Sequence, residues 1–149
     1  MRAPKTRGPL RTLSRAALLL WASPYTLIGI AVGLLGLVSG GKVQVRRGVV
    51  EFYGGFVQWA LQRLPTGPLT MAMTLGHCIL GQTDASLDVA RDHEHVHVRQ
   101  FERWGPLMGP AYLGASVYVW LRGRRAYRDN PFEVEAYDAV PRGSSKRRE

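Results

Sequence analysis

A short histidine-rich stretch constrains this chain more than any other feature. Residues 92–100 hold three of the four histidines, and His93 to His97 spell H-E-x-x-H. Residues four apart lie on one face of a helix, so His93 and His97 could bind a single metal ion. Glu94 would then lie beside the metal, where a carboxylate can take a proton from water. His95 would point away from this face, and we predict that it is not a ligand.

The same stretch has the pattern of a helix. Residues 88–104 contain neither Gly nor Pro, and Gly105-Pro106 then supplies a stop signal. The residues that follow the 3.6-residue period are Val89, His93, Val96, His97, Gln100, Phe101 and Trp104, whereas Arg91, Glu102 and Arg103 fall largely off that face. A strand is the alternative, because His93, His95 and His97 alternate. The acidic and long polar side chains of the stretch are poor strand formers and favour the helix.

The N-terminal part of the chain predicts a membrane anchor. Residues 1–15 carry five basic residues and no acid, and residues 16–41 are uncharged. As a helix, this run is long enough to cross a hydrocarbon core of about 30 Å. A cleaved signal peptide is the alternative, but its apolar region is normally about 7–15 residues long and no A-x-A-like site follows here. We therefore expect an uncleaved, single-pass anchor in a bacterial-type plasma membrane, which Pro24 could kink or break into a hairpin.

Two further features of the composition bear on partners. Gly29 and Gly33 have GxxxG spacing, which could seat a partner helix in an oligomer, although ordinary membrane-helix composition also explains it. The formal net charge is +9. Its positive residues flank the apolar segments and occupy the tail, and no nucleic-acid motif accompanies them. Anionic membrane lipids are therefore the expected partner, and nucleic acid is not.

The middle of the chain has the pattern of a small sheet. Residues 42–46 alternate and 49–53 are β-branched and aromatic, with Arg47-Gly48 between them as a turn. Residues 56–64 fit either a strand or a short helix, and 65–68 give a turn signal. Residues 69–80 then predict one strand, so we expect a small antiparallel sheet before the histidine helix. The single cysteine, Cys78, excludes an internal disulfide and has the pattern of a buried apolar residue.

The C-terminal part predicts two more helices and a tail. Residues 104–121 are uncharged and would be about 27 Å long as a helix, which is borderline for a span. Their Gly and Pro residues favour a buried or membrane-grazing helix. Two spans would also satisfy the flanking basic charges, but would put His93 and Glu133 on opposite sides of the membrane. Asn130 and Pro131 predict a helix start, and 141–149 is polar, basic and expected to be disordered.

Two motifs together resemble a known family. H-E-x-x-H at residues 93–97, followed by N-P-F-E-V-E-A at 130–136, resembles the gluzincin zinc metallopeptidases, over roughly residues 70–138. It is distantly similar to the membrane-bound CaaX-type and heat-shock-induced proteases. It looks closer to small uncharacterised bacterial membrane proteins with H-E-x-x-H-x-x-Q and N-P-x-E-x-E-A. This resemblance implies zinc (Zn2+) as cofactor, His93, His97 and Glu133 as ligands, and Glu94 as catalytic base.

Alternatives remain open for the supporting residues. Glu133 stands three positions after Asn130, so it could instead complete a helix capping box. Glu135 is a spare candidate ligand that would face elsewhere on the same helix. His77 is a candidate for second-shell or oxyanion support, and a buried, hydrogen-bonded histidine is the other interpretation.

These observations predict an α+β chain with an N-terminal membrane helix, a small antiparallel sheet, a zincin-like active-site helix and two further helices. The expected boundaries are 1–41 for the basic N-terminus and anchor, 42–140 for the zincin-like domain and 141–149 for the tail. The function we expect is that of a membrane-anchored zinc metallopeptidase, a hydrolase that cleaves peptide bonds. The alternative is a non-enzymatic membrane protein that binds a metal or a partner, such as an inactive peptidase relative.

Overall fold

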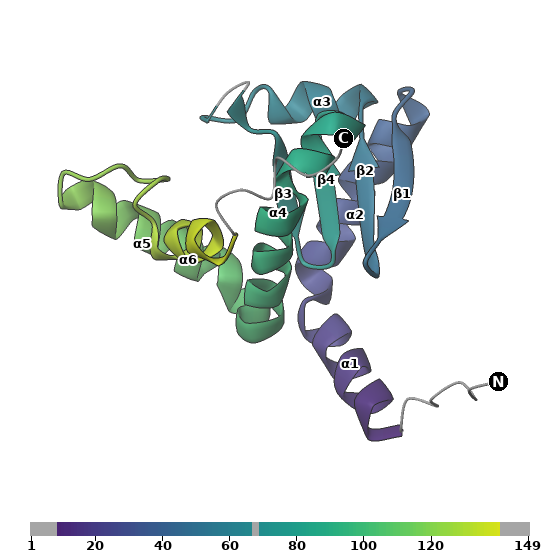
Figure 1. Cartoon of the computed structure of the whole chain (residues 1–149), viewed down its shortest axis with the longest axis horizontal. Helices are drawn as coiled ribbons and strands as arrows, with labels where there is room; N and C mark the ends of the chain where they lie inside the picture. The colour runs from purple at the N-terminus through teal and green to yellow at the C-terminus, as the bar shows by residue number, and fades with distance from the viewer. Residues whose placement is uncertain (1–8, 67–68, 141–149) are drawn as a thin grey trace.

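The computed structural model describes residues 9–66 and 69–140, with side chains from residue 14 onward. It is an α+β structure (Figure 1). In chain order its elements are α1 (Pro9–Trp21), α2 (Ser23–Val38), β1 (Lys42–Arg46), β2 (Val49–Tyr53), α3 (Gly55–Leu61), β3 (Ala72–Leu75), β4 (Cys78–Gly81), α4 (Asp84–Trp104), the 3-10 turn η2 (Gly105–Leu107), α5 (Met108–Leu121) and α6 (Pro131–Ala139). The turn expected at 65–68 lies partly outside the described residues, and the tail 141–149 lies wholly outside them.

The four strands form a mixed sheet in the order β1-β2-β4-β3. β1 and β2 form the predicted antiparallel hairpin, with Lys42 opposite Tyr53. β3 and β4 are also antiparallel, whereas β2 and β4 run parallel. The prediction of a purely antiparallel sheet was therefore wrong. For residues 56–64 the sequence fitted either a strand or a short helix. Most of this segment belongs to α3, which connects β2 to the β3–β4 hairpin.

The prediction of one strand over residues 69–80 was also wrong. The chain turns back at Gly76, where φ is +63°, a conformation that favours glycine. A Cβ atom at Gly76 would lie 2.2 Å from the Thr26 hydroxyl oxygen, so glycine also allows α2 to approach this turn. This single glycine therefore divides the predicted strand into two, β3 and β4.

Helices cover both faces of the sheet. Along β4, Cys78 and Leu80 pack with α2 and α3, whereas Ile79 between them packs with Leu87 and Val98 of α4. This alternation is the two-residue period of a strand that is buried on both sides. α4 therefore lies in its own layer, against β3 and β4, and α5 and α6 extend to one side of it (Figure 1).

Glycines bring α2 close to the sheet. A Cβ atom at Gly29 would lie 2.8 Å from Cβ of Cys78, and one at Gly33 would lie 2.3 Å from the Phe52 ring. The face on which we expected a partner helix is therefore covered by the sheet of the same chain. The opposite face of α2 is apolar and exposed, through Leu27, Ile28, Leu34, Leu35 and Val38.

The uncharged segment 16–41 does not form one helix. α1 and α2 meet at Ala22, and Pro24 lies in the first turn of α2. In the part of the chain that the structure describes, no single helix has the length and apolarity needed to cross a membrane. Residues 14–21 and 23–38 reach that length and composition only as a pair, bent by 66°. The predicted effect of Pro24 on this segment is thus seen as a sharp bend.

The predicted helix at 88–104 is confirmed as part of α4, which begins earlier, at Asp84. A reciprocal capping box between Thr83 and Ser86 sets this start. Val89 was expected on the buried face but is 65% exposed, whereas Arg91 was expected off that face and is buried. The sheet therefore covers more of the helix than one apolar stripe indicates.

Candidate metal centre

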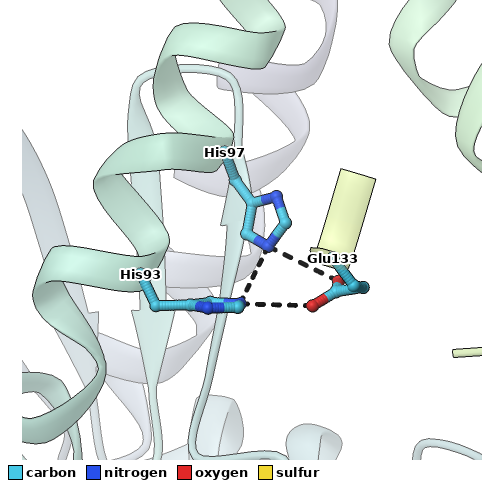
Figure 2. A group of neighbouring side chains, drawn as sticks. All are labelled: His93, His97 and Glu133. Carbon is cyan, nitrogen blue, oxygen red and sulfur yellow. Dashed lines mark hydrogen bonds and ion pairs between the residues drawn. The ribbon is translucent and has the colours of Figure 1, made fainter. Parts of the chain in front are cut away.

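Three donor groups converge between α4 and α6. His93 and His97 lie one turn apart on α4 and both point toward Glu133 of α6 (Figure 2). The two Nε2 atoms are 3.1 Å apart. His93 Nε2 lies 3.2 Å from Glu133 Oε2, and His97 Nε2 lies 3.4 Å from Glu133 Oε1. We call His93, His97 and Glu133 the triad.

The spacing of the triad fits a tetrahedral metal. Zinc binds His nitrogen and carboxylate oxygen at about 2.0–2.2 Å, and in a regular tetrahedron such bonds place the donor atoms about 3.3–3.5 Å apart. The two imidazole nitrogens are 3.1 Å apart, and each lies 3.2 or 3.4 Å from a different oxygen of the Glu133 carboxylate, so each of these pairs is close to this value. With one donor atom taken from each residue, all three lie within 4.8 Å of one another. The triad is therefore a group that could hold a metal ion. Two His and one carboxylate also form a ligand set that catalytic zinc sites use.

Asn130 explains how Glu133 reaches this position. Its side-chain Oδ1 accepts a hydrogen bond from Phe132 N at 2.9 Å and so caps α6. Its Nδ2 donates to Tyr112 O at 3.0 Å and to Ser116 Oγ at 2.8 Å, which ties the start of α6 to α5. The predicted cap is confirmed, and Asn130 makes it without Glu133, whose side chain is turned to the triad.

The triad is strongly coupled electrostatically. Burial by itself would raise the pKa of Glu133, but hydrogen bonding to His93 and His97 outweighs it and lowers the pKa to about 2. Burial would lower the pKa of His97, but the Glu133 and Glu94 carboxylates outweigh it and raise the pKa to about 9. Without a metal, His97 therefore carries a proton at neutral pH, and its positive charge stands where a metal ion would otherwise balance Glu133.

Glu94 lies next to the triad on α4 and is 5% exposed. Thr74 of β3 donates to its Oε2 at 2.7 Å. Burial raises the pKa of Glu94, and the nearby His97 and the Thr74 hydrogen bond only partly oppose this rise. A buried carboxylate with a raised pKa is a stronger base than an exposed one, as a proton-transfer group requires.

Gln100 supports the triad, a role that the sequence analysis did not assign to it. It is fully buried, and its Oε1 lies 2.8 Å from His97 Nδ1. Its Nε2 donates to Phe132 O at 3.0 Å and to Glu135 Oε2 at 2.9 Å. Gln100 thus orients one candidate ligand and links the two helices that supply all three. Its place one turn after His97 on the same face was the available signal.

The remaining site predictions fall at different places. Glu135 contacts Gln100 and Arg103, so it reaches the triad only through Gln100. His77 lies in the β3–β4 turn, where its Nε2 is 2.9 Å from Glu102 Oε1 and its backbone N–H binds Thr26. The contacts of His77 thus fit the interpretation as a hydrogen-bonded histidine of the fold.

His95 is directed away from the triad, as its place on the helix predicts. Burial and the nearby Arg47 lower its pKa. The group whose donor atoms meet contains His93, His97 and Glu133 and does not contain His95.

A cavity of about 550 Å³ opens beside the triad. Glu94, His97 and Glu133 line it, together with residues of β3 and α5. Tyr112 of α5 also lines it and donates from its hydroxyl to Glu133 Oε1 at 2.8 Å. The candidate metal centre is therefore accessible to a ligand of considerable size.

Searches of protein-family models, curated proteins and solved structures found nothing that matches this chain.

Proposed function

We propose that the chain is a membrane-associated, zinc-dependent metallopeptidase. The observation that supports this most is the convergence of two imidazole nitrogens and one carboxylate, with donor atoms within 4.8 Å of one another, beside the buried Glu94 and an open cavity. A structural zinc site is closed by four protein ligands, whereas a catalytic site has three and an open position. The triad supplies three, next to a cavity.

Each residue would have a defined part in hydrolysis. The triad would hold zinc, which supplies Lewis-acid polarisation and acidifies water. Thr74 engages Oε2 of Glu94, which leaves Oε1 to take a proton as the water oxygen bonds to the substrate carbonyl carbon. Glu94 then passes this proton to the nitrogen as the C–N bond breaks. Gln100 and Tyr112 hold His97 and Glu133 in orientation.

Strand β3 suggests how a peptide would be presented. β3 is at the end of the sheet and pairs with β4 on one side. Gln82 N donates to Met71 O at 3.0 Å, so the backbone groups of the alternate residues Ala72 and Thr74 point to the free edge. A peptide that added to this edge as a strand would pass beside Glu94.

Membrane association belongs to the same proposal. The outward face of α2 is apolar, and Leu18 to Trp21 of α1 are also exposed. A contiguous exposed apolar surface marks an interaction site. The basic residues near the N-terminus favour anionic lipid as the partner. Replacing Leu34 and Leu35 together by Glu should weaken flotation with anionic vesicles without changing the zinc content. Unchanged flotation would remove this face from the proposal.

Zinc content and cleavage measured together test the enzyme. Wild type should bind about one zinc per chain, and Glu94→Gln should retain it while losing peptide cleavage by roughly 10²–10⁴-fold, since only the base is removed. His93→Ala should lose both, and His95→Ala is the matched control that should keep both. Zinc-loaded wild type that cleaves no peptide in a library would instead indicate a metal-binding protein without peptidase activity.

A further inference from the structure

The cavity beside the triad has walls that are almost entirely apolar. The apolar residues that line it are Leu64, Met73, Leu75, Phe101, Met108 and Leu113. Of the described residues in its lining, those that can carry a charge near neutral pH are Glu94, His97 and Glu133, all at the metal centre. Away from that centre, no described lining residue offers a counter-charge to a ligand.

The hydroxyl groups of the cavity are mostly engaged within the protein. Ser116 accepts a hydrogen bond from Asn130 at 2.8 Å, and Thr66 and Thr70 bond to each other. Tyr25 donates to Pro106 O at 3.3 Å. A charged or strongly polar ligand group would lose its hydration here and find few partners, which costs free energy.

Contacts between α2, α4 and α5 fix the inner wall. The rings of Tyr25 and Phe101 pack with centroids 5.0 Å apart. A Cβ atom at Gly109 would lie 2.0 Å from the Tyr25 hydroxyl oxygen, so this glycine is what lets the tyrosine reach α5. The wall is therefore built by tertiary packing rather than by a loop, and such a pocket is pre-formed.

We propose that this cavity is a specificity pocket that selects an uncharged, apolar side chain of the peptide substrate, with Leu113 at its rim. The inference rests on the proposed function, because it assigns the substrate class of the same site. Residues of β3 and of α5 both line the cavity, so side chains of a peptide aligned on the free edge of β3 would enter the apolar space. Leu113 lines this space and is 65% exposed, which places it at the opening.

Two peptide hydroxamates test the proposal in the zinc-loaded full chain. They share a zinc-binding hydroxamate and backbone, and differ in carrying an isobutyl or a carboxyethyl side chain. The isobutyl compound should bind roughly 10–200-fold tighter, the discrimination that an apolar pocket achieves. Leu113→Lys should narrow this ratio by about two- to fivefold, as expected for a partly exposed ion pair. Leu121 is 71% exposed on the same helix and lies outside the cavity. Leu121→Lys is therefore the control and should leave the ratio of the two affinities unchanged.

The outcomes separate the pocket from the metal centre. Equal binding of the two hydroxamates, lost from both in His93→Ala, overturns the specificity pocket and leaves the zinc centre standing. If Leu113→Lys and Leu121→Lys reduce the affinity ratio of the two hydroxamates equally, the pocket is also overturned, because the added positive charge alone then explains the change. Binding of neither compound to wild type overturns the pocket and the proposed function together.

Discussion

Helix α4 carries two buried charged clusters, and they differ in how well their charges are satisfied. On the side facing β2, Arg91 makes two hydrogen bonds to Glu51, from Nε to Oε1 at 2.8 Å and from Nη2 to Oε2 at 3.0 Å. On the side facing α6, the triad sets two imidazole nitrogens 3.1 Å apart against one carboxylate. In the first cluster, each hydrogen-bond donor of the pair faces an acceptor. In the second, the lone pairs of the metal-ligating atoms converge on one point.

This difference separates a structural cluster from the candidate metal centre. A bidentate Arg–carboxylate pair is complete, and nothing further is needed to satisfy it. The triad is completed by a proton or by a metal ion, because its donor atoms converge. Buried charge alone therefore does not identify a site in this chain; the direction of the lone pairs does.

The largest effect that distinguishes the clusters is expected on stability. Glu51→Gln would remove the buried counter-charge of Arg91 and leave it only the exposed Asp88, which should cost about 3–5 kcal/mol of unfolding free energy. Asp88 is the exposed partner of Arg91, with 59% of its side chain exposed. Asp88→Asn should therefore cost only about 0–1 kcal/mol of unfolding free energy. Denaturant unfolding followed by circular dichroism measures both. A loss under about 1 kcal/mol in Glu51→Gln would show that the Arg91 cluster is not structural.

A pH titration should change the charge of the triad and leave Arg91 charged. The pKa of His97 is raised from 6.5 to about 9, so His97 is protonated at pH 7 and must release that proton to bind zinc. Zinc affinity should therefore fall by up to about tenfold per pH unit below pH 9, or up to about 100-fold from pH 8 to pH 6. Hydrogen bonding to Glu51 raises the pKa of Arg91 further, so Arg91 keeps its charge throughout.

Competition with a chelator at pH 6 and pH 8 measures this slope. The same shift acts on the metal-free protein with a defined sign. The raised pKa of His97 contributes stability that is complete below pH 6.5 and is lost as the pH rises through about 9. A zinc affinity that does not change between pH 6 and pH 8 would contradict the assignment of His97 as a ligand that is protonated in the metal-free protein.

The sequence predicted the parts of the fold that depend on local patterns. The helix around His93, the hairpin at 42–53 and the cap at Asn130 are each encoded by neighbouring residues, and the structure confirms them. The parallel pairing of β2 with β4 depends on which edge the second hairpin joins, and no local pattern encodes this. The role of Gly76 likewise depends on Thr26, far away in the chain.

The candidate site shows the same limit. The i, i+4 spacing of His93 and His97 predicted that both could face one ion, and the structure places both nitrogens accordingly. The burial of Arg91 was missed because Glu51, its partner, lies 40 positions earlier. Gln100 was recognised only as part of a motif, since its link to Glu135 exists only once α6 has packed on α4.

Gln100 offers the next test, of intermediate size. Gln100→Leu keeps a buried side chain of similar volume but removes the hydrogen bond to His97 Nδ1. Loss of a partner that orients a ligand typically weakens metal binding by about 10–100-fold. Arg99→Leu, at the exposed neighbouring position, is the matched control and should leave zinc affinity unchanged. Equal affinities of Gln100→Leu and wild type would mean that His97 needs no support from Gln100.

The smallest effect is expected at a third charged contact of α4, which lies on the surface. Arg47 Nη1 and Asp92 Oδ1 are 2.7 Å apart, with side chains 58% and 42% exposed. Water and salt screen such a pair, so Asp92→Asn should cost no more than about 1 kcal/mol, and less in about 1 M salt. Because Asp92 precedes His93 but points to Arg47, zinc affinity should not change. A loss as large as that of Glu51→Gln would show that distance, and not burial, governs these ion pairs, and the contrast between the two buried clusters would then need another cause.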